Sequence, residues 1–346
     1  MSKFMKYLGS VIFGGLLVWL AFKDEDWSTF GAKLQEVDLG PILAYLALFS
    51  VAHILRIFRW GVLVRALGPV PWRAVAGAGA VGYMCIMVFP LRLGEFVRPY
   101  LIRRIDGVTA SGALATVVVE RVIDGLIFVG LFFVFITLLP PSGHPAVSVV
   151  KLGAYLAGAV FVTTLAVLIF SYVRRRQTVN LISSIGGRIS PRLTVKLVGL
   201  LESFLDGLRV LPDRRRLMAF MLFTAVYWTA LGVGMKWVAT GVHIFDLTYT
   251  GGFALLTVLT VGIMIPAGPG FAGTFEMALK AGFALLIMSP GSVERIVLYT
   301  VILHLAQLVV QVGFGALWLL TGQVDISGVF GRTGVQDHGN QVGAQD

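Results

Sequence analysis

The stretch VTASGALATVVVERVIDGLIFVGLFFVFITLL occupies residues 108–139 and is predominantly apolar, with three charged residues near its middle. A run of roughly 18 or more such residues is typical of a membrane-spanning helix. Its three charges, Glu120, Arg121 and Asp124, would each cost about 2.5–3.5 kcal/mol at the centre of a spanning helix. We therefore predict a spanning helix whose charged side chains point into the protein and away from lipid.

The composition extends this prediction to the whole chain. Of 346 residues, 57% are hydrophobic and 13% are charged, and the mean hydropathy is +0.86. A soluble domain carries roughly twice that charged fraction. The net charge of +10 does not indicate nucleic-acid binding, because the basic residues lie between apolar segments, where the positive-inside rule places them. We expect a bacterial cytoplasmic (inner) membrane protein with both termini in the cytoplasm.

The apolar runs predict an all-α, polytopic fold of about six spanning helices plus two broken segments. The spans cover about residues 7–22, 39–64, 108–139, 147–172, 217–239 and 295–320. The broken segments cover about 74–89, which stops at Pro90 between two basic flanks, and about 249–288, which contains PAGPG at 266–270. Basic residues on both flanks of the first broken segment favour a re-entrant hairpin. Eight or nine full spans are the alternative.

The order span, span, broken segment, span occurs twice and predicts two inverted repeats, a recurring plan of transporters. The first repeat would cover about residues 1–140 and the second about 147–321 of one membrane domain, 1–321. Residues 177–216 predict an amphipathic insertion on the cytoplasmic membrane surface, because polar residues recur every three or four positions. Residues 322–346 predict a polar, disordered tail.

Catalytic signatures are absent from the sequence. It contains no HExxH, CxxC, GxSxG or P-loop motif, and its five histidines have no metal-ligand spacing. The single cysteine, Cys85, lies in an apolar run. We therefore predict no metal, no cofactor and no enzymatic activity, although an unfamiliar membrane enzyme stays open.

The first charged cluster follows the break at Pro90. Arg92, Glu95 and Arg98 recur at a spacing of three and share one helical face, with Gly94 between them. Two guanidinium groups at this spacing could clamp a phosphate while the carboxylate orients them. The alternative is that these arginines only set topology and reach to water at the interface.

The second cluster is Glu120, Arg121 and Asp124 in the opening stretch. These residues could line a polar cavity for a lipid head group. The alternative is an ion pair that ties this helix to a neighbour.

The third cluster lies at the second break. Pro266 and Pro269 interrupt the helix. The new helix that follows would present backbone N–H donors that favour an anion. Glu276 lies inside this new helix. The alternative is a hinge in which Glu276 is hydrogen-bonded internally. Glycines that permit close backbone approach surround the break: Gly268, Gly270 and Gly273.

These motifs together resemble the membrane domain of the lysylphosphatidylglycerol synthase family, in a stand-alone, flippase-like form. The resemblance rests on Arg59-Trp60, R-x-G-E-x-x-R at 92–98, V-V-x-E-R-x-x-D at 117–124, F-x-x-G-L-x-x-L at 204–211 and P-x-x-P-G-x-x-G-x-x-E at 266–276. It implies translocation of a lipid or lipid-linked molecule. In the family the domain is often fused to an aminoacyl-transferase, which this sequence lacks, and some relatives are associated with polyprenyl-phosphate sugars.

The resulting hypothesis is a flippase for an anionic phospholipid or a polyprenyl-phosphate-linked lipid. Its partners would be membrane lipids, with a lipid synthase or glycosyltransferase as a further protein partner; the oligomeric state is left open. The alternatives are an enzyme that modifies lipid head groups, with Glu95 or Glu120 as base, and a non-transporting scaffold for a lipid synthase. In the flippase, Arg92, Arg98 and Arg121 would hold the phosphate, and the acids would orient them or exchange protons. The predicted lipid-binding residues are Arg59, Arg92, Glu95, Arg98, Glu120, Arg121, Asp124 and Glu276.

Overall fold

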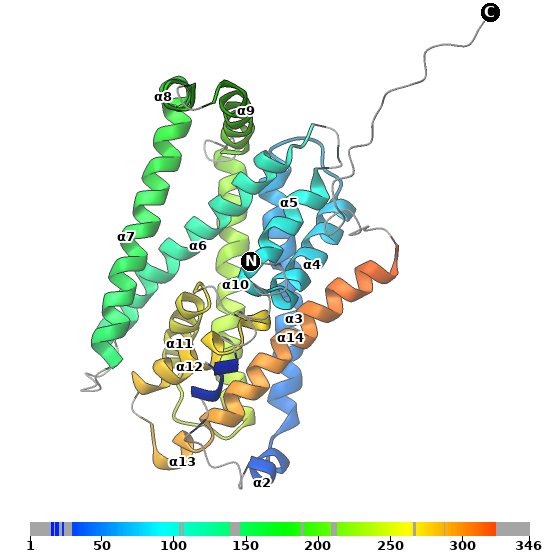
Figure 1. Ribbon diagram of the computed structural model, residues 1–346. Helices are drawn as coiled ribbons and strands as arrows, with labels where there is room; N and C mark the ends of the chain where they lie inside the picture. The colour runs from blue at the N-terminus through cyan, green and yellow to red at the C-terminus, as the bar shows by residue number, and fades with distance from the viewer. Residues whose placement is uncertain are drawn as a thin grey trace, which may run out of the picture.

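A computed structural model describes residues 15–16, 18–20, 23, 30–103, 105, 107–138, 146–187, 190–208, 213–265, 268–286 and 288–322. All regular elements in these residues are helical, which confirms the predicted all-α class (Figure 1). The predicted first span lies largely outside the described residues, and the predicted disordered tail lies outside them except for its first residue.

Four helical stretches in the described residues are long and apolar enough to cross a membrane. They are Leu39–Val64 (α3), Lys151–Val173 within α7 (Ala146–Val173), Arg214–Gly241 (α10) and Gly291–Leu320, which contains α14 (Ile296–Leu320). Helix α6 (Ala110–Leu138) has 29 residues and is also longer than a bilayer core requires, but carries the three charges quoted above. The long helices therefore follow the predicted spans closely.

Polar residues set the starts of two of these helices. Asp38 precedes α3 and accepts a hydrogen bond from the Gly40 N–H at 2.9 Å. Asp213 does the same for α10 by accepting from the Arg216 N–H at 3.1 Å. Each carboxylate satisfies a backbone donor that the first turn of a helix leaves free, so each span begins where the sequence supplies a cap.

Both predicted helix breaks are present. Helix α4 (Trp72–Val88) ends before η2 (Pro90–Phe96), which leads into α5 (Val97–Ile102), with positive φ at Leu91 and Arg92. Helix α11 (Tyr249–Gly262) ends before η4 (Pro269–Phe271) and α12 (Thr274–Ala284). The new helix thus begins at Thr274, four residues after the end of the PAGPG stretch.

The two halves pack against each other through equivalent helices. Helix α3 packs along α10, the broken helix α4 packs on α14, and α11 packs on α6 (Figure 1). If the predicted repeats are exchanged, α3 takes the place of α10, α4 that of α11 and α6 that of α14, and the same three contacts result. Repeats related by a two-fold axis would require this. The inverted orientation of the repeats and the re-entrant path of the broken segments stay predictions.

The predicted insertion forms two helices at one end of the molecule, α8 (Arg175–Gly187) and α9 (Pro191–Gly207) (Figure 1). An ion pair of 2.7 Å joins Arg175 to Asp206. The opposite end carries two short helices, α2 (Phe30–Gln35) and α13 (Pro290–Val293).

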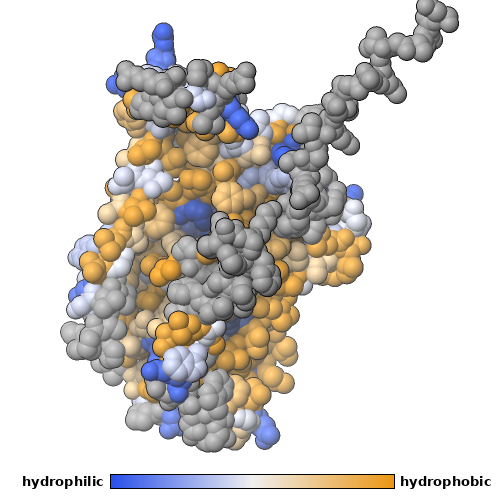
Figure 2. All heavy atoms as spheres, viewed as in Figure 1, coloured by the Kyte–Doolittle hydropathy of each residue, from blue (hydrophilic) through white to orange (hydrophobic). Residues whose placement is uncertain are grey.

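Large apolar side chains cover the outside of the long helices. Along α7, Leu156 and Val160 are each about 60% exposed. Figure 2 shows apolar residues over much of the visible face between the two ends. Soluble monomers rarely expose such a continuous apolar surface, so a lipid environment accounts for it.

Candidate functional site

Arg59 joins α3 to α6 through buried ion pairs. It leaves α3 and makes two hydrogen bonds to Asp124, at 2.6 and 2.8 Å, and one to Glu120 Oε1 at 2.7 Å. All three side chains are almost fully buried. Planar guanidinium groups suit such forked contacts, and here they pair charges that would be costly in lipid.

Arg98 completes the connection from the broken segment. Its guanidinium donates to Glu95 Oε2 at 2.9 Å, to Glu120 Oε2 at 3.0 Å and to the Tyr83 hydroxyl at 2.8 Å. The side chain reaches them by passing over Gly82, where an added Cβ would lie 2.0 Å from Arg98 Cγ. Gly82 therefore makes room for the buried arginine.

Arg92 and Arg121 lie at the edge of this group and are 16% and 22% exposed. Arg121 is 2.6 Å from Glu120 Oε1, and Arg92 is 3.2 Å from Glu95 Oε1. Arg92 also donates to the Ile263 carbonyl at 2.9 Å, where α11 ends. The first break thus contacts the second half of the protein directly.

Arg56 differs from these arginines because it has no acidic partner among the described residues. Its guanidinium lies 4.0 Å from the centre of the Tyr83 ring and 3.4 Å from Gln311 Oε1. No carboxylate of the described residues lies within 4.0 Å of it, and its buried Nε has no hydrogen-bond partner there. Among the described residues, the rings of Tyr83 and Tyr227 and the Gln311 amide hold this cation.

These side chains form what we call the charged network, and its formal charge is positive. The network consists of Arg56, Arg59, Arg92, Arg98, Arg121, Glu95, Glu120 and Asp124. Five guanidinium groups and three carboxylates leave a charge of 5 − 3 = +2. An uncompensated charge among membrane helices is expensive, so this region favours an anion.

A cavity of about 60 Å³ lies beside the network, between the two halves. Arg56, Arg92, Arg121 and Asp124 face it, and Gln307 and Gln311 of α14 add amide groups. We call it the cationic cavity. It has room for a few ordered waters, so a larger ligand would require the surrounding helices to separate.

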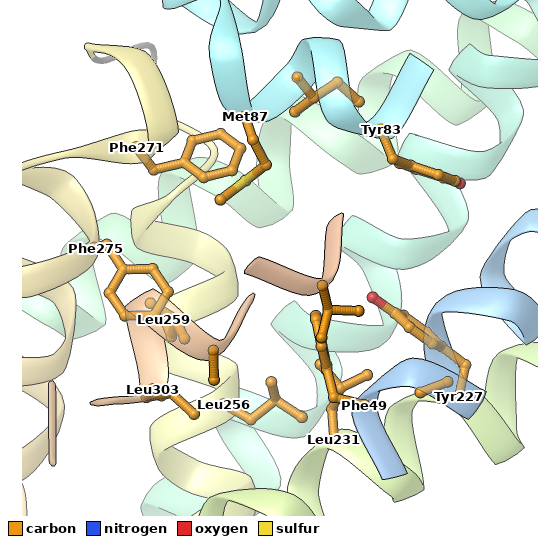
Figure 3. Close-up of a cluster of buried hydrophobic side chains, with 14 of the residues drawn as sticks. Phe49, Tyr83, Met87, Tyr227, Leu231, Leu256, Leu259, Phe271, Phe275 and Leu303 are labelled. Carbon is orange, nitrogen blue, oxygen red and sulfur yellow. The ribbon is translucent and has the colours of Figure 1, made fainter. Parts of the chain in front are cut away.

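Apolar side chains from both halves enclose this cavity. Figure 3 shows Phe49, Tyr227 and Leu231 on one side and Phe271 on the other, directed toward a shared interior. Arg92 lies 5.3 Å from the centre of the Phe271 ring, which joins the polar lining to this wall. The cationic groups therefore lie in surroundings of low polarity, which strengthens their attraction for an anion.

An apolar groove of about 330 Å³ adjoins the cavity. Trp228 and Leu256 line both spaces. Trp228 also donates to Asp124 Oδ1 at 3.1 Å and packs edge-on against Phe128. The remaining walls of what we call the apolar groove come from α6, α10 and α11: Ile127, Phe128, Leu131, Phe135, Met221, Thr224, Ala225, Thr229 and Phe253.

Glu276 lies at the second break and makes its contacts there, with His304 and Gly273. Its Oε1 lies 2.6 Å from His304 Nδ1, and its Oε2 accepts a hydrogen bond from the Gly273 N–H at 2.6 Å. One of the N–H donors expected to attract an external anion, that of Gly273, is therefore already occupied. This geometry matches the alternative prediction, in which Glu276 is hydrogen-bonded within the protein.

Residues 7–315 match the family described as the lysylphosphatidylglycerol synthase transmembrane region. The chain belongs to this family. It is also 26% identical over 280 residues to a protein of Haloferax volcanii named "Glycosyltransferase AglD". That match covers 73% of this chain and 44% of the relative, so the chain corresponds to less than half of that protein's length. No solved structure matches the chain.

Within this family member, most of the predicted lipid-binding residues are brought together. Seven of the eight form one ion-pair cluster, with Arg92 and Arg121 at its edge. Arg98 is fully enclosed by its partners and does not line the cavity, so the predicted phosphate clamp of Arg92, Arg98 and Arg121 loses one member. Glu276 lies apart and does not orient these arginines.

The predicted helix-break residues lie at the two breaks, except that Pro266 falls outside the described residues. Gly94 packs so closely that an added Cβ would lie 2.1 Å from the Ile86 backbone nitrogen. Gly270 and Gly273 have positive φ, and Phe271 between them shares this conformation at a cost of about 1–3 kcal/mol. Gly268 precedes Pro269, which opens η4.

Sequence reasoning missed five residues of these sites. Arg56 entered the sequence analysis only among the basic residues covered by the positive-inside rule, and His304 only among the five histidines without metal-ligand spacing. The other three are uncharged side chains that hold charged ones: Tyr83, Trp228 and Gln311.

Proposed function

We propose that this protein moves an anionic lipid, a phospholipid or a polyprenyl-phosphate-linked lipid, from one leaflet of the membrane to the other. The observation that carries the proposal is the cationic cavity between the two halves, with Arg56 unpaired by any described carboxylate. A lipid phosphate supplies the negative charge that the network lacks and accepts several guanidinium hydrogen bonds at once. Arg56, Arg92 and Arg121 would hold the phosphate, since these three arginines face the cavity.

The apolar groove supports a lipid as the ligand over a free anion. It shares Trp228 and Leu256 with the cationic cavity, so a single molecule with a charged head and a hydrocarbon tail could occupy both spaces. Arg59, Arg98, Glu120 and Asp124 would then fix the position of the phosphate-binding arginines. We assign these four residues a positioning role because they are buried and form ion pairs with one another.

The basic ends of the helices support a cytoplasmic location for the end that carries α8 and α9. Arg65, after α3, and Arg216, in the first turn of α10, line one surface depression at this end. The positive-inside rule places such arginines in the cytoplasm. We accordingly propose the cytoplasmic membrane as the location, with the N- and C-termini on the cytoplasmic side.

The name of the Haloferax relative keeps one second candidate open, an enzyme that modifies the lipid head group. In that case Glu95 or Glu120 would act as a base. Both carboxylates are bonded to arginines, Glu120 to three of them, which leaves little basicity for catalysis. We therefore favour transport, with no catalytic residue.

The test is a leaflet-exchange assay in vesicles that contain the purified protein. Fluorescent phosphatidylglycerol and a fluorescent polyprenyl phosphate would be compared with a zwitterionic phosphatidylcholine probe. We expect movement of at least one anionic lipid, its loss in Arg56→Gln, and its retention in Arg65→Gln. Arg65 is the matched control because it extends from the same end of α3 but bonds the Val70 carbonyl outside the cavity.

Movement of neither anionic lipid, under any ion gradient, would refute the proposed transport. A head-group change detected by mass spectrometry of the recovered lipid would instead support the enzyme. Equal movement of phosphatidylcholine would contradict the role of the cationic cavity.

A further inference from the structure

The imidazole of His304 is held between two hydrogen-bond acceptors. Its Nδ1 lies 2.6 Å from Glu276 Oε1, and its Nε2 lies 2.7 Å from the carbonyl oxygen of Gly270. The ring stacks on Phe275 with a centre-to-centre distance of 4.2 Å. This places a histidine of α14 across the second helix break.

The number of protons follows from this geometry. A carbonyl oxygen cannot donate, so Nε2 must carry a hydrogen, and a neutral imidazole then has none on Nδ1. A hydrogen bond between Nδ1 and Oε1 needs one more proton, on either the ring or the carboxyl group. The arrangement is therefore complete only when the Glu276–His304 pair holds one proton more than a carboxylate and a neutral imidazole.

Loss of that proton would break the contact. The Nδ1 lone pair would then face a carboxylate at 2.6 Å, and the pair would acquire a negative charge among membrane helices. The strained backbone at Phe271 is held by these contacts, because the preceding residue, Gly270, accepts a hydrogen bond from His304 Nε2. Without the proton, repulsion between Nδ1 and Oε1 pushes the imidazole away from Glu276, and this movement weakens the hydrogen bond from the same ring to Gly270.

The break is also a wall of the cationic cavity. Phe271 lines that cavity and lies against Arg92, which bonds the Ile263 carbonyl at the end of α11. Displacement of the His304 ring, which holds Gly270, would therefore free Phe271 and widen a cavity that is too small for a lipid phosphate. The proton and the lipid would act on the same segment.

Other ionisable groups near the pair are few in the described residues. Across the break, η2 contributes Arg92, and α3 contributes Tyr45 through its hydrogen bond to Gln307. The remaining packed helices carry Lys280 on α12, Lys151 on α7, Tyr299 on α14, Tyr83 and Cys85 on α4, and Tyr227 on α10. Among the ionisable groups, the short hydrogen bond singles out Glu276 and His304 as the proton-binding unit.

We propose that Glu276 and His304 form a proton-binding site that keeps the second helix break closed when occupied, and that release of the proton opens the cationic cavity to lipid. Its coupling to transport rests on the function proposed above. A proton gradient would then be the driving force for movement of the lipid.

The first test measures opening without measuring transport. Hydrogen–deuterium exchange of peptides spanning residues 268–276 would be recorded in lipid nanodiscs from about pH 5 to 9.5 and corrected for intrinsic exchange. If one proton is bound only in the closed state, the opening constant rises about tenfold per pH unit once the site titrates. We expect this slope in wild type and no slope in Glu276→Gln, whose amide can donate to Nδ1 at every pH.

His304→Gln serves as a second variant and should also lose the slope. His53→Phe is the matched control, because His53 is another buried histidine beside α14, packed between Tyr83 and Phe314 without a hydrogen-bond partner in the described residues. It should keep the slope. A slope of zero in wild type, or a full slope in Glu276→Gln that elutes and melts like wild type, would overturn the proposal.

Proton flux into dye-loaded vesicles, driven by a lipid gradient, distinguishes the two proposals. If hydrogen–deuterium exchange depends on pH but no lipid moves, the proton-binding site stands and transport is refuted. If lipid moves but hydrogen–deuterium exchange does not depend on pH, transport stands and the proton-binding site is refuted.

Discussion

Arg56 and Arg59 lie one turn apart on α3, and the same substitution in each should have opposite consequences. Arg59 is fully buried and bonded to Glu120 and Asp124, whereas Arg56 has no described carboxylate within 4.0 Å. Replacing Arg59 by Gln breaks its buried ion pairs with Asp124 and Glu120 and leaves Asp124 with Trp228 and a more distant Arg121, which costs about 3–5 kcal/mol of folding free energy. Replacing Arg56 by Gln removes an uncompensated cation and should leave stability unchanged or improve it.

For lipid binding, in contrast to stability, Arg56→Gln should have the larger direct effect. A hydrogen bond to a charged group contributes about 1.5–3 kcal/mol, so loss of Arg56 should weaken binding of an anionic lipid about 10- to 150-fold. Arg59→Gln should affect binding only through loss of the fold.

Two measurements on purified protein separate these effects. Unfolding in mixed micelles of increasing dodecyl sulfate content, followed by circular dichroism, gives stability. Native mass spectrometry with phosphatidylglycerol and phosphatidylcholine gives binding selectivity. Destabilisation of Arg56→Gln comparable to that of Arg59→Gln would refute the charge assignment, and so would unchanged preference for the anionic lipid in Arg56→Gln.

Two further predictions concern other parts of the molecule. Gly94→Ala should destabilise the protein by about 1–3 kcal/mol or more, measured by the same unfolding assay, because the new Cβ meets the Ile86 backbone, which cannot move aside; an unchanged midpoint would contradict the observed packing of η2 on α4. The pKa of Glu36 is lowered from 4.5, first by its hydrogen bond from Arg295 and then by the charge of that residue. A carboxyl group whose pKa is lowered in the folded state stabilises the fold at pH values above its unfolded-state pKa, and this stabilisation is lost as the pH falls through the folded-state pKa. The stability difference between wild type and Glu36→Gln should therefore disappear in acid. A stability difference that does not depend on pH would exclude this ion pair.

The spans were predictable because their signals are local. The predicted 39–64 corresponds to α3, Leu39–Val64, since Asp38 caps the start and polar residues follow the end. Pro90 and Pro269 likewise marked the breaks, because proline cannot continue a helix. Such features depend on residues within a few positions of each other.

The pairing of charges was not predictable to the same degree. Charged residues in apolar surroundings identified Glu120 and Asp124 as important, but Arg59 is 61 and 65 residues away from them in the chain. Only the packing of α3 on α6 selects these partners from the arginines available. Arg56 resembled a topology charge because the residues that hold it, Tyr83 and Gln311, come from α4 and α14.

His304 illustrates the limit most clearly. A single histidine in an apolar helix has no spacing pattern, and its partners Glu276 and Gly270 lie at the second helix break, 28 and 34 residues away in the chain. Its importance depends on a backbone conformation at Gly270 that composition and periodicity do not specify.

The separation between Arg59 and its acids also constrains how the protein is made. At roughly 5–20 residues per second, α6 is synthesised about 3–12 s after α3. During this interval the guanidinium of Arg59 has no carboxylate of α6 to neutralise it, and its burial in lipid would carry the full cost of a charge. Helix α3 therefore reaches its final depth together with α6, and insertion of the first half is a cooperative event that ends when Glu120 and Asp124 arrive.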